Sequence, residues 1–204
     1  MKIVRRLAVF FLIAAFALAA AYAVVVVRYG FSARATPSRA EIFLATTARS
    51  LAVPSGYRQL HNPFSASTEN VNAGMEHFAD HCATCHGNNG SGDTLLGNGM
   101  YPKPPDMRQA ATQNKSDGEL YYIIENGIRL SGMPAFGENP GTNDAETWHL
   151  VTFIRHMPQL TAEELAKMAA LNPKTDEDRT EEQDEQDFLN GGNSRQTNSS
   201  SHHH

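Results

Sequence analysis

The sequence lacks several features that define common protein classes. It has only two cysteines in 204 residues, and no internal repeat is visible. No stretch of useful length alternates apolar and polar residues, so a fold built on strands is not expected. The formal net charge is −5, which excludes a nucleic-acid binder on electrostatic grounds. The expected class is therefore all-α, without a nucleic-acid partner.

The two cysteines form the short motif CATCH at residues 82–86. A redox dithiol would need only Cys82 and Cys85, and it belongs near a βαβ pattern, which is not found here. A zinc site would need four ligands and could recruit His81 and His86. C-x-x-C-H is the recognised signature for covalent haem attachment, with each thiol forming a thioether and the histidine facing the iron. We favour haem c, bound through both cysteines and ligated by His86.

Such an iron has a second axial position, for which methionine is a common ligand. The stretch SGMPAFG at residues 131–137 contains Met133 between a glycine and Pro134, and such a loop can wrap to the opposite face of a haem. Met133 is therefore the predicted second ligand of the iron. The alternatives are Met100 and then Met107, and Met133 could instead be a packing residue.

From about Val71 to Pro158 the chain resembles a class I c-type cytochrome. A helix with Gly74, Phe78 and Cys82 at steps of four leads into CATCHG, a Met-Pro-Ala-Phe loop follows, and a last helix contains LVTFI at residues 150–154. The resemblance implies a small all-α domain that encloses one haem. It also implies that Gly74 lets the last helix cross the first one closely, and that Phe153 fills the crossing, beside Phe78 and Leu150.

Local signals predict three further helices. Residues 116–119 form a capping box before ELYYIIEN, and Gly127 lies where a left-handed C-cap is expected. Residues 143–146 form a second box, which opens a helix through about Met157. Residues 161–164 form a third box, which opens a short helix.

The resemblance and the composition of the loops suggest further contacts with the haem. A proline carbonyl accepts the ring N–H of the ligating histidine in this family, and Pro104 and Pro105 are equal candidates here. Arg108 suits the haem propionates, since a guanidinium binds a carboxylate through two hydrogen bonds, although it could be an ordinary surface arginine. Leu96 and Tyr101 are expected to exclude water from the haem.

The chain begins with MKIVRR and then an uncharged apolar run of 21 residues, 7–27. A bilayer-spanning helix needs about 20 apolar residues. We therefore expect residues 1–28 to form an uncleaved membrane anchor; the alternative is a signal peptide cleaved after Ala23. Because bacteria attach haem c outside the cytoplasmic membrane, the expected location is a single-pass protein in that membrane, with its haem domain on the periplasmic side.

The rest of the chain divides by composition. Residues 29–70 are expected to be a linker, with helical spacing at 38–52, and residues 71–172 form the predicted cytochrome domain. The tail, 173–204, is polar and acidic and cannot bury enough surface to fold.

An iron ligated by histidine and methionine has no open position for substrate, so the expected function is one-electron transfer. The chain would be a carrier, or the haem subunit of a respiratory or dehydrogenase complex, rather than an enzyme in itself. Its partners would be redox proteins that the sequence does not identify. The alternatives are a gas sensor with a labile methionine ligand and, less favoured, a peroxidase.

Overall fold

The structure of the chain is a computed structural model that describes residues 2–29, 32–137 and 144–174, together with positions 180, 183–186 and 189. Over these residues the regular elements are all helical, which confirms the predicted all-α class. The helices are α1 (Lys2–Tyr29), α2 (Arg39–Ala52), α3 (Ser55–Arg58), α4 (Thr68–His81), α5 (Ala83–His86), α6 (Leu95–Asn98), α7 (Ala110–Gln113), α8 (Asp117–Asn126), α9 (Ala145–His156), a 3₁₀ turn (Met157–Gln159) and α10 (Ala162–Leu171).

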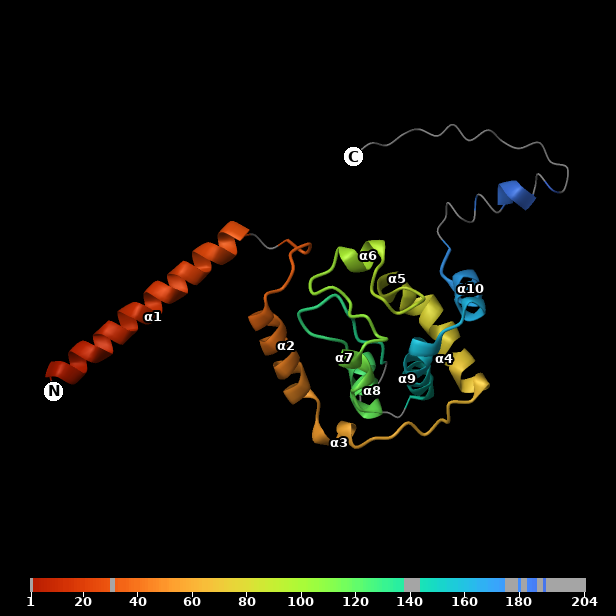
Figure 1. Cartoon of the computed structure of the whole chain (residues 1–204), viewed down its shortest axis with the longest axis horizontal. Coiled ribbons are helices and arrows are strands. Elements are labelled where there is room, and N and C mark those ends of the chain that lie inside the picture. The colour runs from red at the N-terminus through yellow and green to blue at the C-terminus, as the bar shows by residue number, and fades with distance from the viewer. Residues whose placement is uncertain are drawn as a thin grey trace.

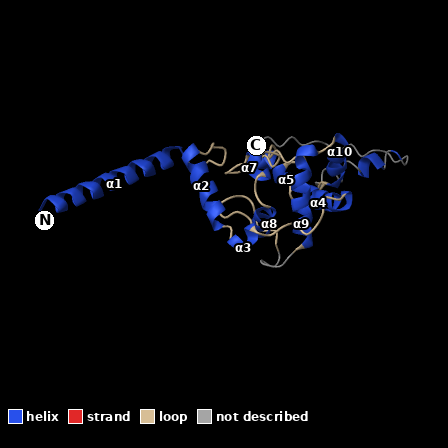
Figure 2. Ribbon diagram, turned by 60° about the horizontal axis from the view of Figure 1, so that its bottom comes forward, coloured by secondary structure: helices blue, strands red, loops and turns tan. Residues whose placement is uncertain are grey.

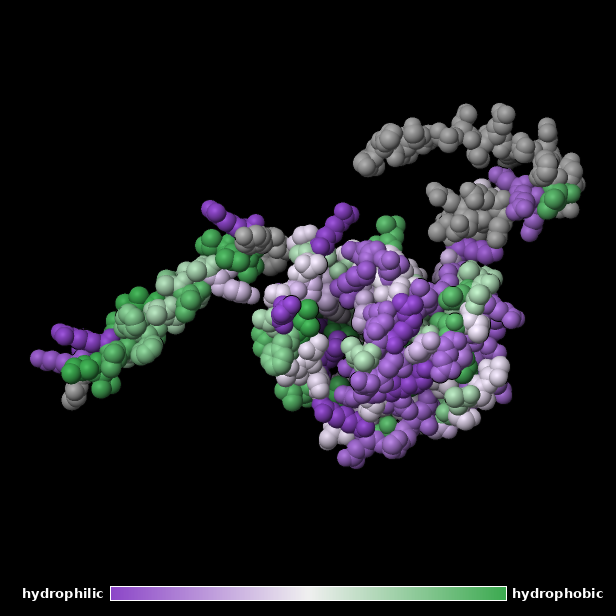
Figure 3. Space-filling model, viewed as in Figure 1, coloured by the Kyte–Doolittle hydropathy of each residue, from purple (hydrophilic) through white to green (hydrophobic). Residues whose placement is uncertain are grey.

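The first helix, α1, extends away from the folded domain, and both ribbon views show this separation (Figures 1 and 2). It is long and apolar enough to cross a membrane by length and composition, and its apolar stretch is not buried against the rest of the chain. In the space-filling view α1 is largely apolar, whereas the visible face of the folded domain is largely polar (Figure 3). The helix therefore fits the expected membrane anchor.

The centre of the domain is the crossing of α4 and α9. A Cβ placed on Gly74 of α4 would lie 2.0 Å from the carbonyl oxygen of His149 and 2.9 Å from Cβ of Phe153. The rings of Phe78 and Phe153 lie beside this contact, with their centroids 5.3 Å apart. Both rings are buried. The predicted close crossing at a glycine is confirmed.

Three aromatic rings connect α3, α8 and α9. Tyr121 of α8 stacks on Trp148 of α9 at a centroid distance of 4.4 Å, and Tyr57 of α3 stacks on Tyr121 at 6.3 Å. Tyr121 and Trp148 are both fully buried. Trp148 is therefore a core residue that fixes α9 against α8.

The domain packs further toward the N-terminus than the predicted boundary at residue 71. Val53 is buried. The side-chain amide of Asn62 donates hydrogen bonds to the Trp148 carbonyl at 3.0 Å and to Oγ1 of Thr152 at 2.8 Å. The second half of the predicted linker thus belongs to the packed domain. Of the predicted tail, 173–204, the structure describes positions 173, 174, 180, 183–186 and 189, and positions 180, 183–186 and 189 are helical.

The helix α2 confirms the helical spacing seen at residues 38–52. Ser38 and Glu41 form a capping box at its start. None of its residues is buried, and it contacts the domain through polar groups: the Tyr101 hydroxyl donates to Glu41 at 3.1 Å, and Arg58 donates to the Ser50 carbonyl.

The predicted caps determine where the other helices begin. Capping boxes join Ser116 to Glu119 and Thr161 to Glu164, as expected. Gly127 follows α8 with a φ of 63°. The cap of α9 is Asp144, whose carboxylate accepts from two backbone N–H groups. Asn143, the first residue of the predicted box, lies outside the described residues.

Replacing Gly74 with alanine should destabilise the domain, because the new methyl group would overlap the backbone of α9. Overpacking of this kind costs about 1–3 kcal/mol. Urea unfolding of the haem-loaded protein, followed by circular dichroism, measures the loss.

The matched control for this prediction is Gly56→Ala in α3, where a new Cβ meets nothing within 4 Å. A glycine-to-alanine change without strain stabilises by about 0.4–1 kcal/mol through the unfolded chain. Equal unfolding free energies for the two variants would contradict the close crossing.

Candidate functional site

The CATCH segment forms a short helical turn directly after α4. Cys82 ends α4, and its carbonyl accepts hydrogen bonds from the backbone N–H groups of Cys85 at 3.2 Å and His86 at 2.9 Å. Residues at spacings of three and four lie on one face of a helical turn. The two thiols and the imidazole are therefore presented on the same side. Gly87 ends the turn with a φ of 73°.

The two thiols are not activated as a redox pair. Burial, and then the neighbouring Cys85 thiol, raises the pKa of Cys82 to about 12. Burial also raises the pKa of Cys85. A reactive dithiol needs a cysteine whose pKa is lowered, because the thiolate is the nucleophile. The electrostatics of the turn therefore disfavour the dithiol alternative.

The imidazole of His86 is suited to bind a metal ion. Its side chain is 9% exposed, and burial lowers its pKa to about 4, so the ring is neutral at pH 7. A neutral imidazole has a lone pair for a metal. The ring nitrogen Nδ1 is buried without a hydrogen-bond partner. Buried polar atoms normally have hydrogen-bond partners. The unpartnered Nδ1 therefore indicates that the surroundings of this ring are completed only when another group, such as a metal cofactor, binds beside it.

Nδ1 of His86 has no hydrogen-bond partner in this structure. The predicted hydrogen bond from the His86 ring to a proline carbonyl is therefore not formed here. The KPPD segment nevertheless lies close to the turn. Gly92 donates its backbone N–H to the His86 carbonyl at 2.7 Å, and a Cβ on Gly92 would lie 2.3 Å from the Pro104 carbonyl oxygen. Gly92 thus lies between the CATCH turn and the KPPD segment. Of the two candidate prolines, Pro104 is the one whose carbonyl lies against Gly92. Pro105 is exposed.

The other predicted contact residues have protein partners or face solvent. Arg108 forms a two-point ion pair with Asp106, through Nε and Nη2 at 2.8 Å each, and this pairing lowers the pKa of Asp106 to about 2. Tyr101 is 38% exposed and Leu96 is 48% exposed. Their expected role in excluding water from the haem stays a prediction. A propionate role for Arg108 stays a prediction.

Met133 lies in a loop that backbone hydrogen bonds fix on both sides. Its N–H donates to Oγ of Ser131 at 3.2 Å, and its carbonyl accepts from Ile128 N–H at 3.1 Å. Three residues later, the Phe136 N–H donates to the Ile124 carbonyl at the end of α8, at 3.1 Å. The side chain of Met133 is partly buried and packs against the core.

The glycine after α8 lets this loop lie directly on the helix end. A Cβ on Gly127 would lie 2.5 Å from the carbonyl carbon of Pro134 and 2.7 Å from the nitrogen of Ala135. Gly127 has a positive φ, which side chains rarely adopt. The predicted C-cap therefore also positions the methionine loop.

Among the described residues, the other methionines divide into core residues and one neighbour of the loop. The sulfur of Met100 lies 3.1 Å from the position of a Cβ on Gly132, so this alternative ligand is next to the Met133 loop. The core contains four methionines, which fill space between helices: Met75, Met107, Met157 and Met168. Met107, the other alternative ligand, is one of these buried core residues.

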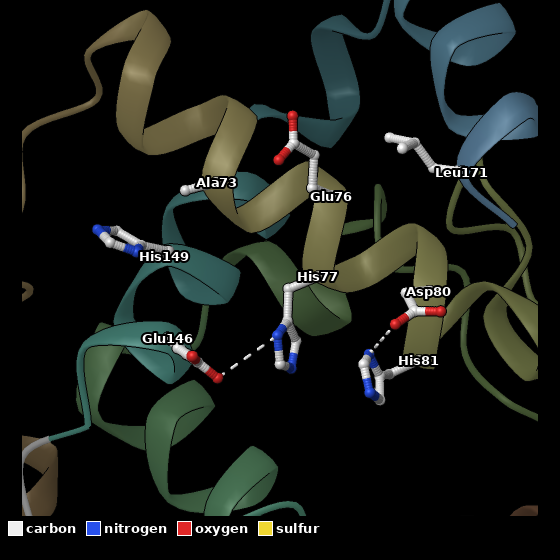
Figure 4. A pocket seen from close by; sticks show the side chains of 8 residues that line it. All are labelled: Ala73, Glu76, His77, Asp80, His81, Glu146, His149 and Leu171. Carbon is white, nitrogen blue, oxygen red and sulfur yellow. Dashed lines mark ion pairs between the residues drawn. The ribbon is translucent and has the colours of Figure 1, made fainter.

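A surface hollow of about 600 Å³ borders α4, α9 and α10, and its lining includes Asp80 and His81, which directly precede the CATCH turn (Figure 4). His81 lies there, 3.2 Å from the Asp80 carboxylate, and its ring stacks on His77. No group of three His, Cys, Asp or Glu side chains among the described residues is arranged to hold a metal ion. His81 therefore does not join the two cysteines, as the zinc alternative would require.

The comparison with protein families decides between these chemistries. The family described as cytochrome c oxidase, cbb3-type, subunit III matches residues 69–154. Residues 69–154 form a c-type cytochrome domain. A search of curated proteins found no match. The cytochrome domain includes the CATCH turn, the Met133 loop and most of α9, and its family implies covalently bound haem c and haem-based electron transfer.

One buried residue of the cytochrome domain was not predicted from the sequence. Glu125, in the last turn of α8, is 1% exposed and its Oε2 has no hydrogen-bond partner. The helical period contains a signal for it, because Glu125 follows Tyr121 by four residues and lies beside Ile124 on the buried face. A charged residue on that face suggests a specific role.

Removing one cysteine should leave at most one thioether in the cytochrome domain. Haem in the native protein should stay with the polypeptide through acid–acetone extraction. Cys82→Ala and Cys85→Ala should each shift the pyridine haemochrome band, because one vinyl group then stays unreacted. Absorption spectra of the purified variants measure this shift.

His81→Asn is the matched control, since this ring lies with Asp80 rather than with the cysteines. It should leave the haemochrome band and the haem content unchanged. Haem that is lost on extraction from the native protein would rule out covalent attachment.

Proposed function

We propose that the chain is a membrane-tethered electron carrier with a single covalent haem, ligated by His86 and Met133. Cys82 and Cys85 attach the haem, which supplies one-electron exchange between ferric and ferrous iron. The observation that supports the carrier role most is the backbone fixation of the Met133 loop, with hydrogen bonds on both sides of the methionine. A fixed methionine would keep the sixth position closed to substrates and gases.

The residues around this site act by holding ligands in place. His86 lies on a turn whose backbone hydrogen bonds are satisfied by Cys82, and its neutral ring needs no deprotonation before it binds iron. Met133 supplies a soft thioether, which favours ferrous iron and raises the reduction potential. Because His86 and Met133 lie on segments packed against the core, they would hold a bound haem iron with little movement between its oxidation states.

The orientation in the membrane follows from the chemistry of attachment. The helix α1 can span a bilayer, and thioether formation to haem takes place outside the bacterial cytoplasmic membrane. We infer that α1 anchors a bacterial protein whose cytochrome domain lies on the periplasmic side. The family to which the domain belongs is described as an oxidase subunit. This supports a role in a respiratory chain, with redox proteins as donor and acceptor.

The main prediction concerns Met133. If its sulfur ligates the iron, Met133→Ala should abolish the weak far-red charge-transfer band of the oxidised protein. It should also lower the reduction potential by on the order of 0.1 V or more, since the axial ligand is a major determinant of the potential. Absorption spectroscopy and redox titration measure both effects.

Met100→Ala is the matched control, because Met100 lies beside the same loop. It should preserve the far-red band. The wild-type ferrous protein should not bind carbon monoxide at neutral pH. Rapid binding by the wild type would favour the gas-sensor alternative, and a band that survives in Met133→Ala would assign the ligand to another methionine.

A separate prediction concerns the anchor. The intact chain should sediment with membranes and resist carbonate extraction, because the apolar surface of α1 is not covered by the rest of the protein. Deleting residues 1–27 behind a cleavable export signal should give a soluble protein that still contains haem. A mature N-terminus at Val24, found by mass spectrometry, would contradict the anchor.

A further inference from the structure

Glu125 is the one acidic side chain that is buried among the described residues. It lies at the C-terminal end of α8, where the helix dipole disfavours a negative charge. A buried charge is costly unless it is paired and hydrogen-bonded. Stability alone would favour an apolar residue at this position, so the carboxyl group needs another explanation.

One oxygen of Glu125 has a partner and the other does not. The hydroxyl of Thr147, in the first turn of α9, donates a hydrogen bond to Oε1 at 2.6 Å. Thr147 is itself buried. Oε2 has no hydrogen-bond partner, and it points toward the end of the methionine loop. A Cβ placed on Gly137 would lie 2.1 Å from Oε2 and 2.8 Å from Cδ.

The backbone of the same loop is attached to α8 at the same place. The last carbonyl groups of a helix have no partner inside the helix. Here the carbonyls of Ile124 and Glu125 accept hydrogen bonds from the N–H groups of Phe136 and Gly137, each at 3.1 Å. The carboxyl group of Glu125 therefore fills the space between the loop end, α8 and α9.

The same face of α8 also contacts the start of α9. One turn before Glu125, the hydroxyl oxygen of Tyr121 accepts a hydrogen bond from the Asp144 N–H at 2.8 Å. The loop that follows Met133 thus contacts Glu125 at Gly137. The cap of α9, Asp144, is hydrogen-bonded to Tyr121. Both contacts are made by neighbouring turns of one helix.

We propose that Glu125 is a positioning residue for Met133. Its carboxyl group, held by Thr147, supports the Gly137 end of the loop and so keeps the thioether at the iron. This inference rests on the proposed ligand role of Met133. It predicts that Glu125 controls how often the methionine leaves the iron, an effect distinct from the stability of the fold.

The test compares three changes in the haem-loaded protein. Glu125→Ala and Thr147→Val should weaken the far-red band and increase the rate of carbon monoxide binding to the ferrous form by about tenfold, the effect of losing one buried hydrogen-bonded contact. Glu125→Gln keeps the shape and an oxygen that can accept from Thr147. It should retain the band and bind carbon monoxide within about twofold of the wild type.

Thr152→Val is the matched control on α9. Thr152 is also buried, but its hydroxyl donates to the Trp148 carbonyl and accepts from Asn62 rather than contacting Glu125. Its loss should lower the urea midpoint without changing the band or the rate of carbon monoxide binding. A change in the band with Thr152→Val as large as with Thr147→Val would show a general stability effect and overturn the proposal.

A double mutant tests the contact itself. Gly137→Ala should displace the loop and speed carbon monoxide binding, because the new methyl group meets the Glu125 carboxyl. In the Glu125→Ala background the same change should have a smaller effect, because the obstructing carboxyl is absent. Additive effects of the two substitutions would contradict a direct contact.

The outcomes separate this inference from the proposed ligand. If Met133→Ala abolishes the band but Glu125→Ala and Thr147→Val leave it unchanged, the ligand stands and the positioning role is wrong. If Met133→Ala leaves the band intact, both the ligand and the role of Glu125 are overturned. Should Glu125→Ala fail to fold, Thr147→Val and Glu125→Gln decide the matter by the same two measurements.

Discussion

The close approach of α4 and α9 at Gly74 is the contact on which the rest of the domain depends. It places the backbone of α9 where any side chain on Gly74 would lie. The helix α4 leads directly into the CATCH turn, so the crossing fixes the position of His86. The second helix of the crossing, α9, contributes Trp148, whose ring stacks on Tyr121 of α8. One backbone contact thus determines the relative positions of the attachment turn and the helix that supports the methionine loop.

Around this crossing, glycines allow irregular segments to pack where side chains would collide. Gly92 lies between the His86 carbonyl and Pro104, and Gly127 lies against the peptide between Pro134 and Ala135. Both have positive φ angles. Close backbone contacts therefore fix both segments that are expected to contact the haem, the CATCH turn and the Met133 loop. This arrangement suits an electron carrier, since rigid ligands reduce the structural change between oxidation states.

The sequence predicted the features whose causes are local. The CATCH turn, the capping boxes at Ser116 and Thr161, and the helix at residues 38–52 all depend on residues within five positions of one another. The crossing at Gly74 followed from the family resemblance. Contacts between distant segments could not be predicted in the same way. The hydrogen bond from Asn62 to Trp148 spans 86 residues, and no local pattern indicates it.

Some features of the site depend on neighbours that the sequence pattern does not show. Arg108 forms its ion pair with Asp106, only two residues away, and its role toward the haem propionates stays a prediction. Leu96 lies in α6 and Tyr101 follows that helix. Both are exposed, and the Tyr101 hydroxyl donates a hydrogen bond to Glu41 of α2. Glu125 was overlooked because a single acidic residue on the buried face of a helix forms no motif, although the helical period places it on that face.

The central claim is that one iron lies between the ring of His86 and the sulfur of Met133, with the porphyrin attached to Cys82 and Cys85. The most direct measurement is an anomalous-scattering map, recorded at the iron absorption edge, from crystals of the haem-loaded protein. We expect a single iron peak bonded to a nitrogen of His86 and to the sulfur of Met133. A peak bonded to Met100, or an iron with only His86 as its protein ligand, would contradict the account.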